Sequence, residues 1–145
     1  MHKLDQTIAR LRLLLAEIKG REESHAATRR QYEEQIARVI DIAVRGEAGL
    51  DRALTMTADL DARLHDLANR ERYLARIKGQ AQRELESLQL TKTIEEARAQ
   101  IALLRQEQEY DNGAAGADRL KAEIRRLEDV IATASDEAAR SIGRA

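Results

Sequence analysis

The stretch LDQTIARLRLLLAEI, residues 4–18, carries the pattern that decides the fold. Its apolar residues recur at alternating steps of four and three, which places a stripe along one face of a helix for a second helix to cover. The stripe consists of Leu4, Ile8, Leu11, Leu15 and Ile18. The same register then crosses a polar layer, made of Glu22, His25 and Arg29, and is apolar again at Tyr32, Ile36, Val39 and Ala43. We therefore expect one continuous helix whose seam is polar at mid-length.

Two glycines three residues apart, Gly46 and Gly49, interrupt this helix. Glycine costs about 1 kcal/mol relative to alanine inside a helix, whereas a turn can use its freedom. We place a turn near 46–49 and an antiparallel hairpin over residues 1–110, with Tyr32 opposite Leu64 and the polar layer opposite residues 65–71. A single uninterrupted helix from about residue 4 to 108 is the alternative, because the register, which resumes after the glycines, satisfies both.

A third helix is expected after a loop at residues 111–118, DNGAAGAD. Asp118 can cap an amphipathic helix over 119–142. The apolar stripe of this helix consists of Leu120, Ile124, Leu127, Ile131 and Ala134. The predicted fold class is all-α: an elongated antiparallel helical hairpin, or coiled coil, plus a short C-terminal helix.

Several apolar residues lie off the seam, where one partner helix cannot cover them. They are Leu13, Leu14, Ile40, Val44, Leu90 and Leu103. This surplus predicts a further partner, and we expect a homo-oligomer or polymer.

Composition excludes several classes of protein. The 145 residues include 25 Lys+Arg and 26 Asp+Glu, a net charge of -1, with no Cys, Pro, Trp or Phe. Without Cys there is no disulfide and no thiolate metal site. The balanced charge is not that of a nucleic-acid-binding protein. No apolar run approaches the roughly 20 residues that cross a bilayer, and the N-terminus has no signal-peptide pattern. We expect a cytoplasmic chain, with the inner face of the membrane as a peripheral location.

Catalytic and metal-binding patterns are missing from the sequence. His2, His25 and His65 are the histidines, and His25 could approach His65 across the hairpin. No His pair has the spacing of a zinc site, so a solvated polar layer is the favoured interpretation. No nucleophile motif or phosphate-binding glycine loop occurs either. We expect no enzyme, no cofactor and no small-molecule substrate.

The N-terminal 30 residues carry a local positive charge, with seven Lys/Arg against four Asp/Glu. Basic residues beside an apolar stripe are typical of helices that lie on anionic membranes. The candidate membrane surface consists of Lys3, Arg10, Arg12, Leu14 and Lys19. The simpler interpretation is that this stretch is the first half of the hairpin seam, surrounded by solvated cations.

Three stretches resemble the family of phage-shock protein A and the vesicle-inducing protein in plastids, which is bacterial ESCRT-III-like. Residues 46–54, GEAGLDRAL, are similar to the family's Gly-x-Glu-Asp-Leu-Ala-Arg-x-Ala-Leu, with Gly46, Leu50 and Arg52 matching in spacing. Residues 92–98, KTIEEAR, are similar to a Lys-x-x-Glu-x-Arg-Ala region. Residues 118–128 resemble an Asp-Arg-Met…Ile…Met-Glu pattern. The chain is shorter than family members, is expected to lack their N-terminal amphipathic helix, and has Tyr32 where they often have Trp.

The resemblance implies a protein that polymerises into rods or rings and binds or remodels membranes. In that family the last helix docks across the hairpin tip of a neighbouring subunit. The implied assembly residues are therefore Leu120, Ile124, Leu127 and Ile131 on the last helix and Val39, Ala43, Gly46, Leu50, Arg52 and Leu54 around the tip. A soluble coiled-coil adaptor or export chaperone, like the small hairpin proteins of flagellar-type secretion, is the alternative function.

Overall fold

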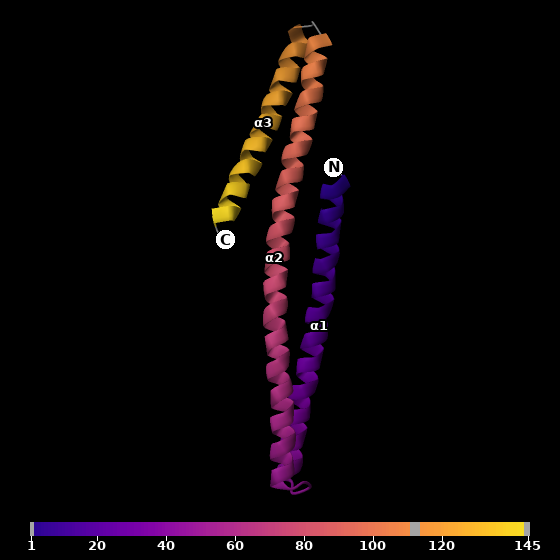
Figure 1. Ribbon diagram of the computed structural model, residues 1–145, viewed down its shortest axis with the longest axis vertical. Coiled ribbons are helices and arrows are strands. Elements are labelled where there is room, and N and C mark those ends of the chain that lie inside the picture. The colour runs from indigo at the N-terminus through magenta and orange to yellow at the C-terminus, as the bar shows by residue number, and fades with distance from the viewer. Residues whose placement is uncertain (1, 111–113, 144–145) are drawn as a thin grey trace. The chain divides into compact units, whose positions relative to one another are not determined.

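The computed structural model describes residues 2–110 and 114–143, and these form three α-helices (Figure 1). The helices are α1 (His2–Val44), α2 (Leu50–Tyr110) and α3 (Ala114–Gly143). α1 and α2 pack against each other as the arms of an antiparallel hairpin. The predicted all-α hairpin with a C-terminal helix is confirmed, and the alternative of one uninterrupted helix over residues 4–108 is wrong, because the chain turns after Val44.

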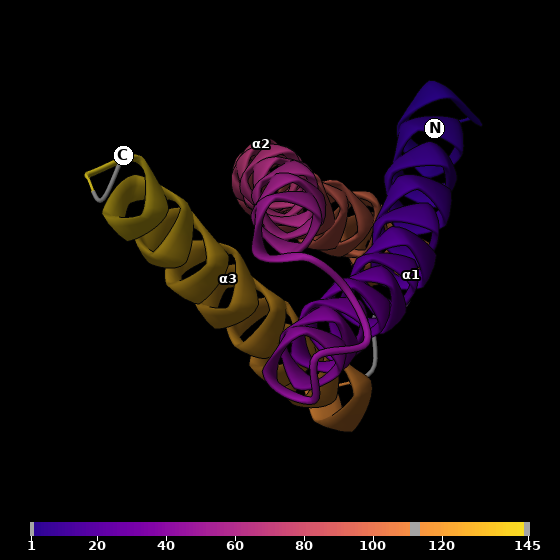
Figure 2. The same ribbon diagram turned by 90° about the horizontal axis from the view of Figure 1, so that it is seen from below.

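The turn between the arms is built by backbone hydrogen bonds around Gly46, which has a φ of 75°. The Gly46 N–H donates to the carbonyl of Ala43 at 3.1 Å, and the Glu47 N–H donates to the carbonyl of Ile42 at 3.0 Å. These are the two bonds of a Schellman motif, with glycine at the left-handed position that side chains disfavour. α2 then begins directly after Gly49, whose carbonyl accepts the Ala53 N–H at 3.0 Å. Figure 2 looks onto this turn.

The chain divides into two compact units. One, Arg12–Ala81, contains the turn and the adjoining part of both arms; the other combines Met1–Leu11 with Gln82–Ala145. The buried residues of the first unit lie on the predicted seam: Ile18, Ala53, Leu60, Leu67 and Ala81. Each is still 3–8% exposed, since two helices shield one stripe only in part.

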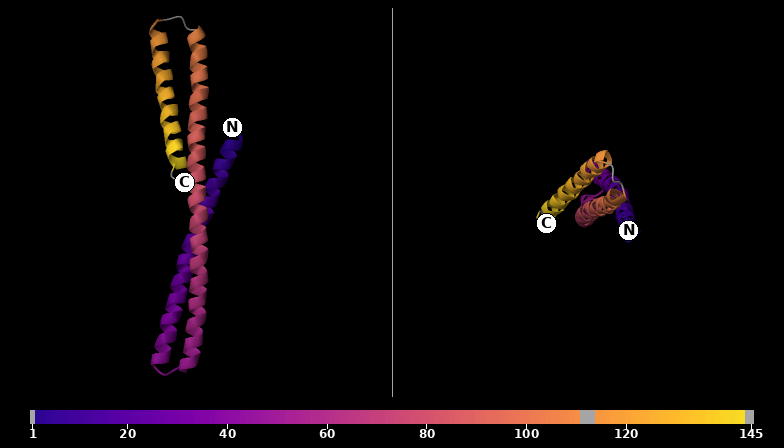
Figure 3. Two further views of the ribbon diagram at one scale, coloured as in Figure 1. Left: turned by 60° about the vertical axis from the view of Figure 1, so that its left-hand side comes forward. Right: turned by 90° about the horizontal axis from the view of Figure 1, so that it is seen from above.

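The second unit has its own core, where α3 runs back along the end of α2 (Figure 3). Ala97 and Ile101 of α2 pack with Ile124 and Leu127 of α3. Partly buried residues around them are Leu104, Val130 and Ile131. In the same unit, Ile8 and Leu11 of α1 are buried, and Asp5 pairs with Lys92 of α2 at 2.9 Å.

The start of α3 differs from the predicted boundary. The helix begins at Ala114, so residues 114–118 are helical instead of forming the second half of a loop. Three alanines in this stretch have the highest helix propensity, and they outweigh Gly116 and the capping preference of Asp118. Residues 111–113 of the predicted loop lie outside the described residues.

Candidate functional site

Four exposed apolar side chains gather at the closed end of the hairpin. We call them the tip patch: Ile40 (51% exposed), Val44 (81%), Leu50 (70%) and Leu54 (58%). Residues four apart lie one turn apart on one helix face, so Ile40 with Val44 and Leu50 with Leu54 form two short rows. The arms are antiparallel and joined by five residues, so both rows lie next to the turn.

The two rows lie on the same side of the hairpin. Ile40 directly follows Val39, a half-buried seam residue, and Leu54 directly follows Ala53, which is buried. In an antiparallel pair, the position after a seam residue rotates toward the same side on both arms, since the helices run in opposite directions. The tip patch is therefore a group of exposed apolar side chains on one side of the hairpin, next to the turn.

The assembly residues implied around the tip divide into four groups. Leu50 and Leu54 belong to the tip patch, while Val39 and Ala43 are half-buried in the seam. Gly46 forms the turn. Arg52 is exposed on α2. Ile40 and Val44 were not among the implied assembly residues, although their apolar character off the seam was the signal that could have placed them there.

The α3 residues of the implied assembly set lie against α2 of their own chain. Ile124 and Leu127 are buried there, Ile131 is partly buried in the same cluster, and Leu120 is half-buried. The apolar stripe of α3 is thus covered without a neighbouring subunit. Arg126 forms an ion pair with Glu123 on the outer surface of α3, and its hydrogen bond lowers the pKa of that carboxyl.

The polar layer of the seam is made of ion pairs between the arms. Arg29 pairs with Glu71, which lies inside the expected stretch 65–71. Glu22 pairs instead with Lys78, whose Nζ lies 3.1 Å from Glu22 Oε1. That partner is nearly two turns beyond the expected stretch. Both ion pairs fit one register of the arms, in which an α1 residue faces α2 about four residues further along the sequence than the predicted pairing of Tyr32 with Leu64 places it.

His25 and His65 do not come together as metal ligands in this layer. His65 is 77% exposed, and its Nδ1 lies 2.9 Å from the carbonyl oxygen of Asp61 on its own helix. His25 is half-buried in the seam, and its Nδ1 is buried with no hydrogen-bond partner. The side chain of His2 lies outside the described residues. Among those described, no three His, Cys, Asp or Glu side chains converge as metal ligands.

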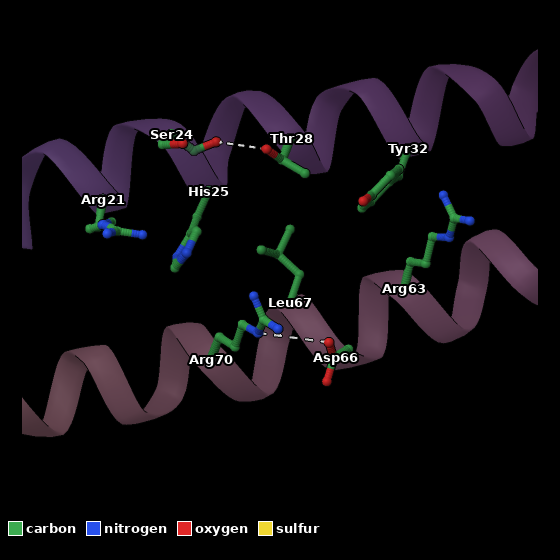
Figure 4. A pocket seen from close by; sticks show the side chains of 9 residues that line it. All are labelled: Arg21, Ser24, His25, Thr28, Tyr32, Arg63, Asp66, Leu67 and Arg70. Atoms are coloured by element: carbon green, nitrogen blue, oxygen red, sulfur yellow. Dashed lines mark hydrogen bonds and ion pairs between the residues drawn. The ribbon is translucent and has the colours of Figure 1, made fainter.

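A basic cleft of about 440 Å³ opens between the arms beside His25 (Figure 4). Arg21 comes from α1, and Arg63 and Arg70 come from α2. The remaining lining residues are Ser24, His25, Thr28, Tyr32, Asp66 and Leu67. Sequence reasoning missed this cleft, because the arginines are far apart in the sequence and none belongs to a motif.

The candidate membrane surface follows α1. Lys3, Arg10, Arg12 and Lys19 are exposed, whereas Leu14 is half-buried. None of the helices, in the part of the chain that the structure describes, contains a segment with the length and apolarity needed to cross a bilayer.

Comparison with protein-family models, with curated proteins and with solved structures finds no match to this chain. The resemblance to the phage-shock protein A family therefore rests on the quoted residues alone.

Proposed function

We propose that this chain is an ESCRT-III-like assembly protein, which polymerises through the tip of its hairpin and binds or remodels membranes. The observation that carries the proposal is the tip patch. It gathers four exposed apolar side chains beside the turn of a chain in which 35% of the residues are charged. Exposed apolar side chains that gather at one place often mark a surface that associates with another protein or with a membrane.

The size of the tip patch argues for many weak contacts. Full burial of a Val, Leu or Ile side chain contributes about 1.5–3 kcal/mol, so covering the exposed parts of these four contributes roughly 5 kcal/mol. Association costs about 4–15 kcal/mol in lost translational and rotational freedom. One contact through the tip patch would therefore be weak, and contacts repeated along a polymer or a membrane would be needed for stable assembly.

The contact implied by the resemblance requires a rearrangement. Ile124 and Leu127 cannot cover the tip patch of a neighbour while they pack on Ala97 and Ile101 of their own chain. Assembly through α3 would therefore compete with the contact between α2 and α3. Exposed cations on α1, such as Lys3 and Arg10, support a role at anionic membranes.

The test is sedimentation velocity with negative-stain electron microscopy, on the protein alone and with phosphatidylglycerol liposomes. We expect rods, rings or coated tubules. The variants Leu50→Asp and Leu54→Asp should disperse them, because covering an unpaired carboxylate with apolar surface costs several kcal/mol. Leu103→Asp is the matched control, since Leu103 is 62% exposed on α2 but lies outside the tip patch.

Two outcomes would overturn the proposal. One is wild-type protein that sediments as a sharp low-mass species and leaves the liposomes bare, which would favour the adaptor or export chaperone. The other is a Leu50→Asp variant that assembles as the wild type does, which would remove the tip patch from the contact.

A further inference from the structure

Two clefts adjoin within the unit Arg12–Ala81. The basic cleft described above shares Arg21, His25 and Arg70 with a second cleft of about 400 Å³. The second cleft is mainly apolar, and its other lining residues are Leu14, Glu17, Ile18, Tyr73, Leu74 and Ile77. Because the shared residues line both, the two clefts form one groove with a cationic part and an apolar part.

The cationic part has more positive than negative charge. Three arginines line it, and Asp66 is the one carboxylate among its lining residues, 3.7 Å from the Nε of Arg70. Arg63 pairs on its own helix with Asp59 at 3.4 Å. Arg21 makes no ion pair with any of the described residues, and Figure 4 shows its side chain in the space between the arms. Arg21 is thus a guanidinium without an ion-pair partner among the described residues, and the nearest acidic residue before it on α1 that lines the groove is Glu17.

The apolar part keeps large side chains in contact with water. Tyr73 is 61% exposed and Ile77 is 52% exposed, beside the half-buried Leu14 and Leu74. On α1 this part extends from Leu14 to the shared Arg21, about 10 Å at 1.5 Å per residue. That length suits a medium-length alkyl chain. An amphipathic partner helix would need an apolar row that continues past Arg21 and Arg70, where the groove becomes cationic.

We propose that this groove binds an anionic amphiphile. Its phosphate or carboxylate head lies between Arg21 and Arg70, and its hydrocarbon chain lies along Ile18, Leu74 and Ile77. Guanidinium groups bind such heads through paired, charge-assisted hydrogen bonds. Each cleft is within the roughly 300–1,000 Å³ range of small-ligand sites. A membrane lipid as the source of the amphiphile rests on the proposed function, whereas binding itself does not require assembly.

The test is calorimetric titration with dodecyl phosphate below its micelle concentration, on the wild type and on the dispersed Leu50→Asp variant. We expect saturable binding of one amphiphile per chain in both. Inorganic phosphate, which has the head without the tail, should bind at least about tenfold more weakly. Binding in Leu50→Asp separates this site from assembly, so the failure of one proposal can be distinguished from the failure of the other.

Variants of the groove locate the site. Arg21→Gln and Arg70→Gln should each weaken dodecyl phosphate binding about tenfold, because each removes a charge-assisted contact. Ile77→Ser should weaken it by shortening the apolar part. Arg30→Gln is the matched control, since Arg30 is exposed on α1 and lines neither cleft. Circular dichroism should give the same helicity for all variants.

Phosphatidylglycerol vesicles distinguish the two sources of the amphiphile. Weakened vesicle binding by Arg21→Gln would assign the site to a lipid headgroup. Unchanged vesicle binding, with weakened dodecyl phosphate binding, would assign it to a free amphiphile. The proposal is overturned if Arg21→Gln and Arg70→Gln bind dodecyl phosphate as the wild type does, if many molecules bind per chain, or if an acidic amphipathic peptide displaces the amphiphile at lower concentration.

Discussion

Gly46 stands in the left-handed region, with φ at 75°, so a side chain there meets backbone strain even though the space around it is open. We expect Gly46→Ala to lower the free energy of unfolding by about 1–2 kcal/mol. Urea denaturation followed by circular dichroism measures this. Gly49→Ala is the control, because Gly49 has no positive φ, and its loss should be smaller. Equal losses in both variants would contradict the Schellman motif.

Within the polar layer, the ion pair of Arg29 with Glu71 is where we expect a single substitution to lower the free energy of unfolding most. Glu71 accepts from Arg29 through Oε2, while its Oε1 is buried without a hydrogen-bond partner. Arg29→Ala leaves this carboxylate unpaired, and we expect a loss of about 1–2 kcal/mol in the free energy of unfolding.

The double variant Arg29→Met with Glu71→Leu tests whether the loss in Arg29→Ala comes from the unpaired carboxylate. It replaces the ion pair with apolar packing, so its stability should return to that of the wild type or exceed it. A double variant less stable than Arg29→Ala would mean that the pair itself stabilises the hairpin strongly.

At this scale the sequence predicts seam residues well and polar partners poorly. Leu60 and Leu67 are buried as the heptad predicts, because burial depends on angular position around the helix. Glu22 pairs with Lys78 outside the expected stretch, because the register of the arms differs by about four residues from the predicted one, and a repeating heptad does not fix it. The basic cleft depends on the same pairing of distant segments, and no local sequence pattern predicts it.

Among the elements, α3 packs on α2 through a small core, in which Ile124 and Leu127 of α3 lie against Ala97 and Ile101 of α2. We expect Ile124→Asp to release α3 and to increase hydrogen exchange across residues 114–143, while residues 12–81 stay protected. Ala132→Asp, at an exposed position of the same helix, should leave exchange unchanged. Exchange that rises equally in residues 12–81 would contradict independent units.

The ends of the helices can be predicted from the sequence where one residue type strongly favours or disfavours a helix. The glycines mark the turn correctly, since one of them takes a conformation that other residues disfavour. The predicted start of α3 is five residues late, because the helix propensity of the alanines before Asp118 outweighs the capping preference of that residue. The surface that covers the stripe of α3 could not be predicted, because an apolar stripe does not specify its partner.

For the whole molecule, stability should depend on protein concentration if the tip patch associates. Association of folded chains stabilises them by mass action. We expect the Tm to rise by about 5 °C or more over a hundredfold increase in concentration. Differential scanning calorimetry measures this, and Leu50→Asp should remove the dependence. A wild-type Tm that is constant over the same range would count against self-association.

The ion pairs of the polar layer also oppose sliding between the arms. A heptad seam repeats, so apolar residues alone would accept a slip by seven positions. Arg29 and Glu22 are themselves seven apart, as are Lys78 and Glu71, and the two pairs have opposite polarity. A slip in one direction sets Arg29 against Lys78, and a slip in the other sets Glu22 against Glu71. Like charges meet either way, so this layer penalises misalignment in both directions, including when two copies exchange arms.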